Sequence, residues 1–297
     1  MFELIQITDK SYYIENPARV GLYRLDRNSV CLIDSGHDRA AGKRILRVLT
    51  ENGWLLNSIY LTHCHADHAR GAAYLTETTG CRLYAPETER EIAMYPILQS
   101  AVLYGGCPPE ELRQKSLMGE PVNAGKVTPD TVPEGFSIIP LPGHFFNMAG
   151  YRTPDGVAYI GDSVLSAETL SRIQIGFVYD VQAQLGSLSR LRKLSAVKFV
   201  PSHAAPVDDI TELSRLNEDK IYEIADLLWD FCSEPRTAEQ IVQYLFGEFS
   251  LRYDFELYSR VSCTARSYLT WLASGGKLKR EFRDNMLYWV RSQGGIL

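Results

Sequence analysis

The chain has 297 residues, of which 45% are hydrophobic and 23% are charged, with a net charge of −5. This composition is ordinary for a globular protein of one large and one small domain, and the negative charge argues against non-specific nucleic-acid binding by the whole surface. No stretch approaches the roughly 18 apolar residues of a membrane span, and the opening residues, MFELIQITD, do not resemble a signal peptide. We therefore expect a cytoplasmic protein whose six scattered cysteines stay reduced.

The first part of the chain has the alternating pattern of β-strands, with polar turns between the alternating segments. We expect strands over residues 2–8, 12–15, 20–25 and 30–34. A helix is expected next, over residues 40–50.

A cluster of polar side chains follows the short apolar run 59–61, which predicts a buried strand. The cluster lies within SIYLTHCHADHARG and consists of His63, His65, Asp67 and His68. These side chains lie on a turn at the carboxyl end of a strand, where ligands collect in open α/β sheets. Imidazole and carboxylate groups bind borderline divalent cations, so the cluster points to a metal site.

Three later strands are each followed by one more side chain of ligand type. The expected pairs are strand 136–141 with His144, strand 157–160 with Asp162, and strand 197–200 with His203. Two nearby residues are not expected to be ligands. His37 is expected at the surface or the pocket rim, and Cys64 is expected to point into the packing, because side chains alternate along a strand.

Residues 87–130 interrupt the α/β rhythm and form an insertion. Helices are expected over 87–94 and 109–118, on either side of the helix-breaking sequence GGCPP. An insertion between ligand-bearing strands can act as a lid. The insertion carries four bulky side chains, Tyr95, Leu98, Leu103 and Tyr104. They either line a substrate pocket or pack the lid onto the body of the protein.

Residues 207–297 have a different character. Amphipathic helices are expected over 208–232, 237–246 and 257–274, followed by a hairpin that turns at Asp284-Asn285. Three helices and a two-stranded wing resemble a winged-helix domain, a class that often binds DNA. Because the first part of this tail is acidic, nucleic-acid binding through it is the weaker interpretation.

The motifs, taken together, resemble the metallo-β-lactamase superfamily. THCHADH at residues 62–68 matches its HxHxDH motif, and Gly143-His144, Gly161-Asp162 and Ser202-His203 match its later motifs in the same order. The resemblance implies an α/β (α+β) fold, an αββα sandwich over residues 1–206 with residues 87–130 as its insertion. A mainly helical, winged-helix-like domain would follow over residues 207–297.

The resemblance also implies a dinuclear metal site. One ion would be held by His63, His65 and His144, and the second by Asp67, His68 and His203, with Asp162 bridging the two. We expect Zn²⁺ in both positions, with iron or manganese as alternatives. Asp34, at a strand end, either orients a ligand histidine or caps the helix expected over 40–50.

The implied activity is hydrolysis of a small-molecule ester, thioester, lactone or phosphodiester by a hydroxide that bridges the two ions. Asp67 and Asp162 would then be the catalytic residues. Gly143-His144-Phe145 differs from the Gly-His-Thr of the glutathione-thioester hydrolases of this superfamily, so the motifs leave the substrate open.

Two other functions are also considered. One is a persulfide dioxygenase with a single iron held by His63, His144 and Asp162, although the sequence after Asp162 does not match that group. The other is a ligand sensor with a DNA-binding tail. A homodimer is compatible with the resemblance, because similar C-terminal domains pack near the active site or against a second subunit.

Overall fold

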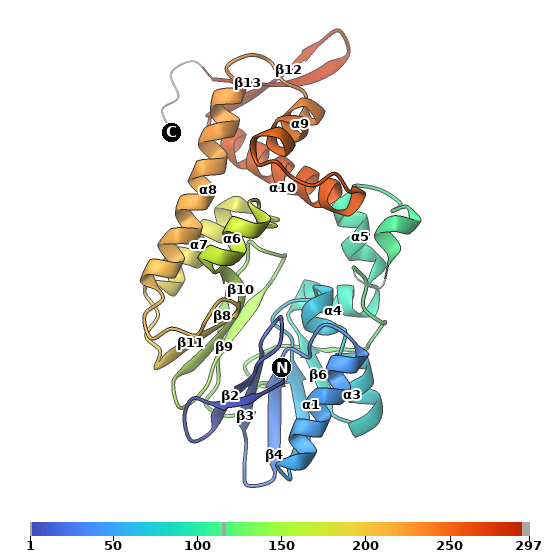
Figure 1. The fold of residues 1–297 in the computed structure, drawn as a ribbon, viewed down its shortest axis with the longest axis vertical. Helices are drawn as coiled ribbons and strands as arrows, with labels where there is room; N and C mark the ends of the chain where they lie inside the picture. The colour runs from blue at the N-terminus through green and yellow to red at the C-terminus, as the bar shows by residue number, and fades with distance from the viewer. Residues whose placement is uncertain (1, 115–116, 293–297) are drawn as a thin grey trace.

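Figure 1 shows the computed structural model of the chain, which describes residues 2–114 and 117–292. Two sheets form its centre, a seven-stranded sheet in the order β1-β2-β3-β4-β5-β6-β7 and a four-stranded sheet in the order β11-β10-β9-β8. A two-stranded hairpin, β12-β13, lies at the far end of the molecule. Within the described residues, no helix has both the length and the apolar character needed to cross a membrane.

The seven-stranded sheet combines antiparallel hairpins with parallel strands. Its members are β1 (Leu4–Gln6), β2 (Ser11–Ile14), β3 (Val20–Arg24), β4 (Ser29–Ile33), β5 (Leu55–Tyr60), β6 (Arg82–Ala85) and β7 (Gly125–Lys126). Strands β1 to β4 pair antiparallel, and β4 to β7 pair parallel because helical segments connect them. The four strands expected at the start of the chain are confirmed: β1 and β3 are shorter than expected, and β2 and β4 begin and end one residue earlier than expected.

The four-stranded sheet carries most of the later motifs. It consists of β8 (Ser137–Pro140), β9 (Ala149–Arg152), β10 (Val157–Leu165) and β11 (Lys198–His203). The sequence predicted that this strand ends at residue 160, before Asp162. Instead, β10 continues past Asp162, with a shift of register near Gly161. A Cβ on Gly161, where φ is +54°, would lie 2.9 Å from Thr62 Oγ1, so the position requires glycine.

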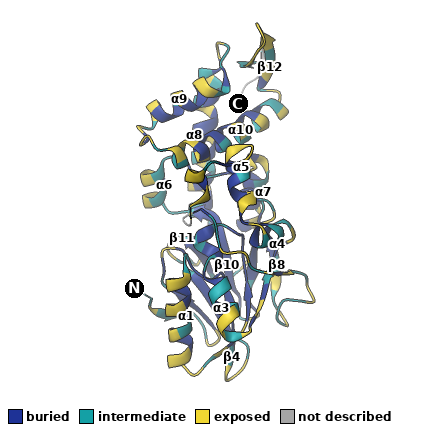
Figure 2. Ribbon diagram, turned by 90° about the vertical axis from the view of Figure 1, so that its right-hand side faces the viewer, coloured by how far each residue is buried: buried dark blue, intermediate teal, exposed yellow. Residues whose placement is uncertain are grey.

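Apolar side chains fill the spaces between the layers. Tyrosines from both sheets, including Tyr60, Tyr151 and Tyr159, pack between them. The outer face of the first sheet packs against α1 (Arg39–Glu51) and α3 (Ala72–Thr79), and that of the second against α7 (Val181–Leu191) and later helices. Figure 2 shows the strands buried between helices whose outer faces are exposed. The predicted αββα sandwich is confirmed.

The insertion contains less helix than expected. Helices α4 (Glu87–Met94) and α5 (Ile97–Tyr104) are followed by a short 3₁₀ turn, η1 (Glu110–Arg113). The helix expected over 109–118 is therefore wrong in type and length. No side chain caps its start after Pro108-Pro109, and Gln114 is already extended. Residues 115–116 lie outside the described residues.

One of the four bulky side chains of the insertion takes the expected packing role, and the expected role in lining a substrate pocket stays a prediction. Leu103 is buried and belongs to a small core with Leu112, Leu117 and Cys263 of the tail. Tyr104 lines a groove of about 930 Å³ between α5 and the tail. The remaining two, Tyr95 and Leu98, are exposed.

The tail contains the three helices and the hairpin expected from the sequence. They are α8 (Thr211–Phe231), α9 (Ala238–Glu248), α10 (Phe255–Ser274), β12 (Leu278–Arg283) and β13 (Met286–Arg291). Asp284 and Asn285 both have positive φ, +49° and +63°, as a two-residue hairpin turn requires. Thr237 and Gln240 form a capping box at the start of α9.

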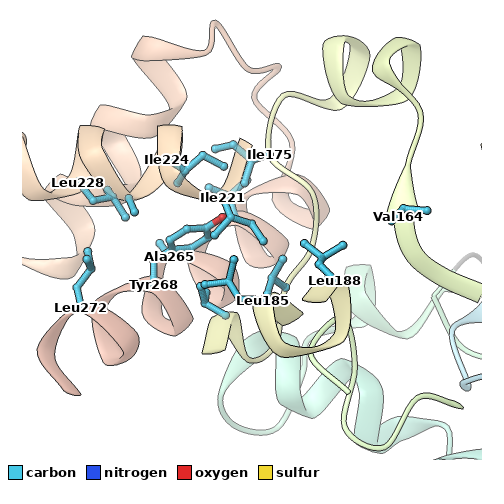
Figure 3. Close-up of a cluster of buried hydrophobic side chains, with 14 of the residues drawn as sticks. Val164, Ile175, Leu185, Leu188, Ile221, Ile224, Leu228, Ala265, Tyr268 and Leu272 are labelled. Carbon is cyan, nitrogen blue, oxygen red and sulfur yellow. The ribbon is translucent and has the colours of Figure 1, made fainter. Parts of the chain in front are cut away.

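The tail helices and the four-stranded sheet share one hydrophobic core. Figure 3 shows Val164 of β10 in the same cluster as side chains of α7, α8 and α10. Asn217 of α8 also bonds both backbone groups of Leu165, at the end of β10, with its Oδ1 and Nδ2 each 2.9 Å away. This packing crosses the predicted boundary between residues 206 and 207, and the division into two domains stays a prediction.

Candidate metal centre

The two sheets bring all seven predicted ligands together. Two ligands follow β5, and the next two lie in the one-turn helix α2 (Ala66–Ala69). His144 follows β8, Asp162 lies in β10 and His203 ends β11. They form two groups of mutually close ligand atoms. The first ligand group is His63, His65 and His144, and the second ligand group is Asp67, His68, Asp162 and His203.

In the first ligand group, three ring nitrogens converge. His65 Nδ1 lies 3.0 Å from His63 Nε2 and 2.9 Å from His144 Nε2. His144 Nδ1 lies 3.0 Å from the carbonyl oxygen of Phe177, which can only accept a hydrogen bond. Nδ1 therefore carries the proton, and the lone pair of His144 Nε2 faces the other two rings.

Burial keeps these histidines uncharged. It lowers the pKa of His63 well below its usual value, and the nearby His68 and His65 lower it further. Burial and the neighbouring His144 lower the pKa of His65 to about 3. The pKa of His144 is also lowered, mainly by burial. At neutral pH the group offers three lone pairs to one point, which suits a cation.

The second ligand group is arranged around Asp162. Its Oδ1 lies 3.1 Å from His68 Nε2, and its Oδ2 lies 3.4 Å from His203 Nε2. Oδ2 is also 3.6 Å from His144 Nε2, which belongs to the first ligand group. Asp67 Oδ2 completes the group, 3.1 Å from His203 Nε2. The Asp162 carboxylate thus lies between the two groups, as the bridging role requires.

Two buried atoms of the second ligand group have no hydrogen-bond partner among the described residues. They are His68 Nε2 and Asp162 Oδ1, which are close but not aligned for a hydrogen bond. Such buried orphans are uncommon in proteins. A cation between them would satisfy both, so the residues present fit a metal ion.

Opposite charges shift the pKa values of the second ligand group. The Asp162 carboxylate raises the pKa of His203 to about 10 against the effect of burial. Burial opposes a charge on His68, but Asp162 and Asp67 outweigh it and raise its pKa well above the usual value. Burial would likewise raise the pKa of Asp162, but His203 and His68 lower it well below its usual value.

Asp34 orients one ligand and does not cap the following helix. Its Oδ2 lies 2.8 Å from His68 Nδ1, and its Oδ1 accepts the backbone N–H of Thr62 at 2.7 Å. The cap of α1 is Asp38, whose side chain accepts from Ala41 N–H at 2.6 Å. The orienting role is therefore confirmed, and a carboxylate behind a ligand histidine fixes its ring and proton position.

Sequence reasoning missed Glu89, which joins two ligand loops. This fully buried side chain of α4 accepts the N–H of Cys64 and the N–H of Asn147, both at 3.1 Å. Cys64 lies between two ligands and Asn147 follows His144, so one carboxylate holds both loops. Burial raises the pKa of Glu89 to about 8, and the two N–H groups limit the rise. One sequence signal existed: helical spacing places Glu89 on the apolar face of α4.

Aromatic rings surround the first ligand group. Phe145 is buried, and its ring centroid lies 4.4 Å from that of His65. The Phe177 ring also lies close, 5.5 Å from the same His65 ring and 6.3 Å from the ring of Phe145. Cys64 is buried and its thiol donates to the carbonyl of Glu89, so it points into the packing as predicted. His37 is partly exposed beside Asp38 and belongs to neither ligand group.

Comparison with known sequences gives matches to part of the chain. Curated relatives include hydroxyacylglutathione hydrolase from Erythrobacter litoralis (strain HTCC2594), 29% identical over 138 residues, 45% of this chain and 45% of the relative. The hydroxyacylglutathione hydrolase of Rhodopseudomonas palustris (strain BisB18) is 31% identical over 139 residues, 46% of this chain and 42% of the relative. The chain thus spans about half the length of the curated relatives it matches.

Solved structures share the fold over nearly the whole chain. A beta-lactamase domain protein from Burkholderia ambifaria has a TM-score of 0.76 and 17% identity, covering 98% of this chain and 94% of that chain. A metallo-beta-lactamase family protein from Thermus thermophilus has a TM-score of 0.70 and 19% identity, covering 97% of each chain.

The family model described as Metallo-beta-lactamase superfamily matches residues 14–203. This match covers more than half of the chain and contains all seven predicted ligands. The αββα sandwich and the two adjacent ligand groups agree with it. The chain therefore belongs to the metallo-beta-lactamase superfamily.

Proposed function

We propose that this protein is a metal-dependent hydrolase that cleaves a thioester with two zinc ions bound by its two ligand groups. The observation that carries the proposal is the position of the Asp162 carboxylate, which faces His68 and His203 of one group and His144 of the other. The two ligand groups contain mainly imidazole nitrogens with two carboxylates, a ligand set that suits zinc. Iron and manganese are the alternative metals.

Two zinc ions in these positions would supply an activated water near neutral pH and would stabilise negative charge on the substrate. The protein's own residues do the rest. Asp34 and the Phe177 carbonyl hold His68 and His144 with their free nitrogens turned inward. Phe145 and Phe177 keep water from one side of the first ligand group.

Asp67 is suited to proton transfer as well as to binding. Its side chain is 43% exposed, whereas that of Asp162 is 7% exposed. A carboxylate that reaches both the ligand group and solvent can accept the proton of the attacking water and pass it to the leaving thiolate, which departs as the thiol. We therefore assign proton transfer to Asp67. Asp162 would bridge the two metal ions and set the distance between them.

Thioesters are favoured over the other predicted substrates because the curated relatives include hydroxyacylglutathione hydrolases. Phe145 occupies the position of the threonine in their usual Gly-His-Thr motif, so we do not extend the proposal to glutathione itself. We assign the tail, predicted over residues 207–297, a winged-helix-like arrangement, which the three helices and the hairpin of residues 211–291 support. We also assign it a role in closing the substrate site, which its shared core with the four-stranded sheet supports. A homodimer and a cytoplasmic location stay predictions.

The proposal is tested by metal analysis and thioester hydrolysis on the same preparations. We expect about two zinc ions per chain and turnover of at least one simple thioester. Asp162→Ala should lose metal and activity, whereas the control His37→Ala should keep both, because His37 lies outside the ligand groups. About one iron per chain would favour the persulfide dioxygenase alternative. Full turnover by metal-depleted protein would refute the mechanism.

A further inference from the structure

A cavity on the tail side of the candidate metal centre has several arginines in its lining. It has a volume of about 600 Å³ and lies between the end of α6 (Ala167–Ile173) and the segment that joins α9 to α10. Its charged side chains are Arg172, Arg252, Arg260 and Asp254. Three positive side chains and one negative side chain give this cavity, the arginine pocket, a net charge of +2, whereas the whole chain has −5.

The nearby carboxylates leave guanidinium groups of the arginine pocket free to bind an anion. Asp254 accepts from Arg252 Nε at 3.1 Å and from its Nη2 at 2.8 Å, so its charge is used on one arginine. Arg260 Nη2 lies 3.8 Å from Glu256 Oε1, which is too long for a hydrogen bond. Arg172, in the last turn of α6, forms no ion pair with any residue that the structure describes.

Two residues of the same lining have an unfavourable backbone conformation. Gln174 has φ +61° and ψ −51°, and Ser250 has φ +48°. Residues other than glycine adopt positive φ at a cost, and such residues cluster at functional sites. Each lies two residues from an arginine of the pocket, Gln174 from Arg172 and Ser250 from Arg252. The turns that place two of the arginines are therefore the strained ones.

Phe177 connects the arginine pocket with the candidate metal centre. Its side chain lines the pocket, and its ring centroid lies 5.5 Å from that of His65 and 5.8 Å from that of His144. Phe177 also lines a second, smaller cavity, whose lining includes His144 and Asp162, one residue from each ligand group. The arginine pocket therefore adjoins the space beside the reacting centre.

Helix α10 gives the separation between the two cavities. Tyr268 lines the smaller cavity and Arg260 lines the arginine pocket. A helix rises 1.5 Å per residue, so these positions lie about 12 Å apart along the axis. In 4′-phosphopantetheine, about twelve bonds separate the sulfur from the phosphate ester oxygen, which span about 14 Å at the reach of an extended peptide chain. A thiol of this length fits the separation.

We propose that the arginine pocket binds the phosphate of a long thiol, so that the substrate is an acyl thioester of 4′-phosphopantetheine, the arm that coenzyme A carries. Guanidinium groups bind phosphate oxygens through parallel N–H donors, and three arginines surround this cavity. The inference rests on the proposed thioester hydrolysis and concerns the thiol half of the substrate, which the motifs left open. It makes Arg172 and Arg260 specificity-determining residues.

The test compares butanoyl thioesters of pantetheine and of 4′-phosphopantetheine, which differ only by the phosphate, with the zinc-loaded full chain. We expect wild-type protein to favour the phosphorylated substrate by about tenfold or more in kcat/KM, the size expected for hydrogen bonds to a charged group. Arg172→Gln and Arg260→Gln should each reduce this ratio without changing kcat/KM for the pantetheine thioester. Raising the salt concentration from about 0.05 M to about 0.5 M should also reduce the wild-type ratio, because salt screens the attraction.

The matched control is Arg266→Gln. Arg266 is an exposed arginine of the same helix, but it lines the groove beside α5 instead of the arginine pocket. This variant should keep the wild-type ratio. A wild-type ratio near one would overturn the proposal. So would an unchanged ratio in both pocket variants, or a loss in Arg266→Gln as large as theirs, at normal zinc content.

A binding measurement separates failure of the arginine pocket from failure of the proposed function. If zinc-loaded wild-type protein cleaves neither thioester, calorimetric titration with pantetheine and 4′-phosphopantetheine replaces the kinetic test. Both carry the same thiol, so any contact of sulfur with zinc contributes equally. Tighter binding of 4′-phosphopantetheine, lost in Arg172→Gln, would support the pocket while the thioesterase proposal failed. Equal binding of the two thiols to wild-type protein would overturn the pocket.

Discussion

Replacing Glu89 by glutamine should weaken metal binding at the first ligand group while sparing the second. Above its pKa of about 8, Glu89 accepts with both carboxylate oxygens, whereas glutamine keeps only one acceptor oxygen, so at that pH either Cys64 N–H or Asn147 N–H loses its buried partner. Leaving one such group unsatisfied costs about 1–3 kcal/mol. If about 2 kcal/mol of this cost destabilises the metal-binding conformation of the two loops, zinc affinity at the first ligand group decreases about 30-fold. This decrease lies within the range measured when residues that hold metal ligands in place are replaced.

The assay is a competition titration of zinc against a chromogenic chelator, which separates the tighter from the weaker ion. Glu89→Gln should hold about one zinc where wild-type protein holds about two. The matched control is Glu91→Gln on the same helix, because Glu91 is partly exposed and, among the residues that the structure describes, pairs only with Arg90. Equal loss of both ions in Glu89→Gln, or an effect no larger than in the control, would refute the reasoning.

Three further predictions follow from the same geometry. Asp34→Asn should weaken zinc binding about 10- to 100-fold at the second ligand group, measured by the same titration, because His68 loses its carboxylate partner; retention of wild-type affinity would contradict this. Phe145→Ala should lower the free energy of unfolding by about 3–5 kcal/mol in denaturant titrations, since its ring is 1% exposed against His65; a loss below about 1 kcal/mol would mean that the ring is not needed. In metal-free protein, the pKa of His203 is raised to about 10 from its usual 6.5, so protonation of His203 stabilises the folded state. This stabilisation is complete below pH 6.5 and is lost as the pH rises toward 10. Chemical unfolding across this range should show falling stability, less so in His203→Gln, and a flat wild-type profile would count against it.

The ligand residues could be predicted from sequence because each lies at or near the end of a local strand pattern. Asp162 shows where this reasoning stops. Its strand was expected to end at Ile160, yet β10 continues through Gly161, whose positive φ and close approach to Thr62 depend on the neighbouring sheet. Glu89 was missed for a similar reason. Its partners, Cys64 and Asn147, are 25 and 58 residues away in the chain, and no local pattern reports such contacts.

The tail helices were also predictable as elements, because their apolar residues recur at helical spacing. What they pack against was not predictable from that spacing. Periodicity identifies the buried face of α8 but not its partner, and here the partner is the outer face of the four-stranded sheet. The helix expected over 109–118 failed for a local reason, since no side chain caps its start at Pro109 and the backbone is already extended at Gln114.

The amide of Asn217 has a consequence for any shortened form of this protein. By bonding both backbone groups of Leu165, it takes the place that a neighbouring strand would fill at the end of β10. Removing residues 207–297 would therefore take away the Asn217 bonds to both backbone groups of Leu165, three residues from Asp162, and would uncover an apolar face. In the full chain, the sandwich and the tail should unfold as one cooperative unit. A truncated sandwich should lose zinc together with solubility.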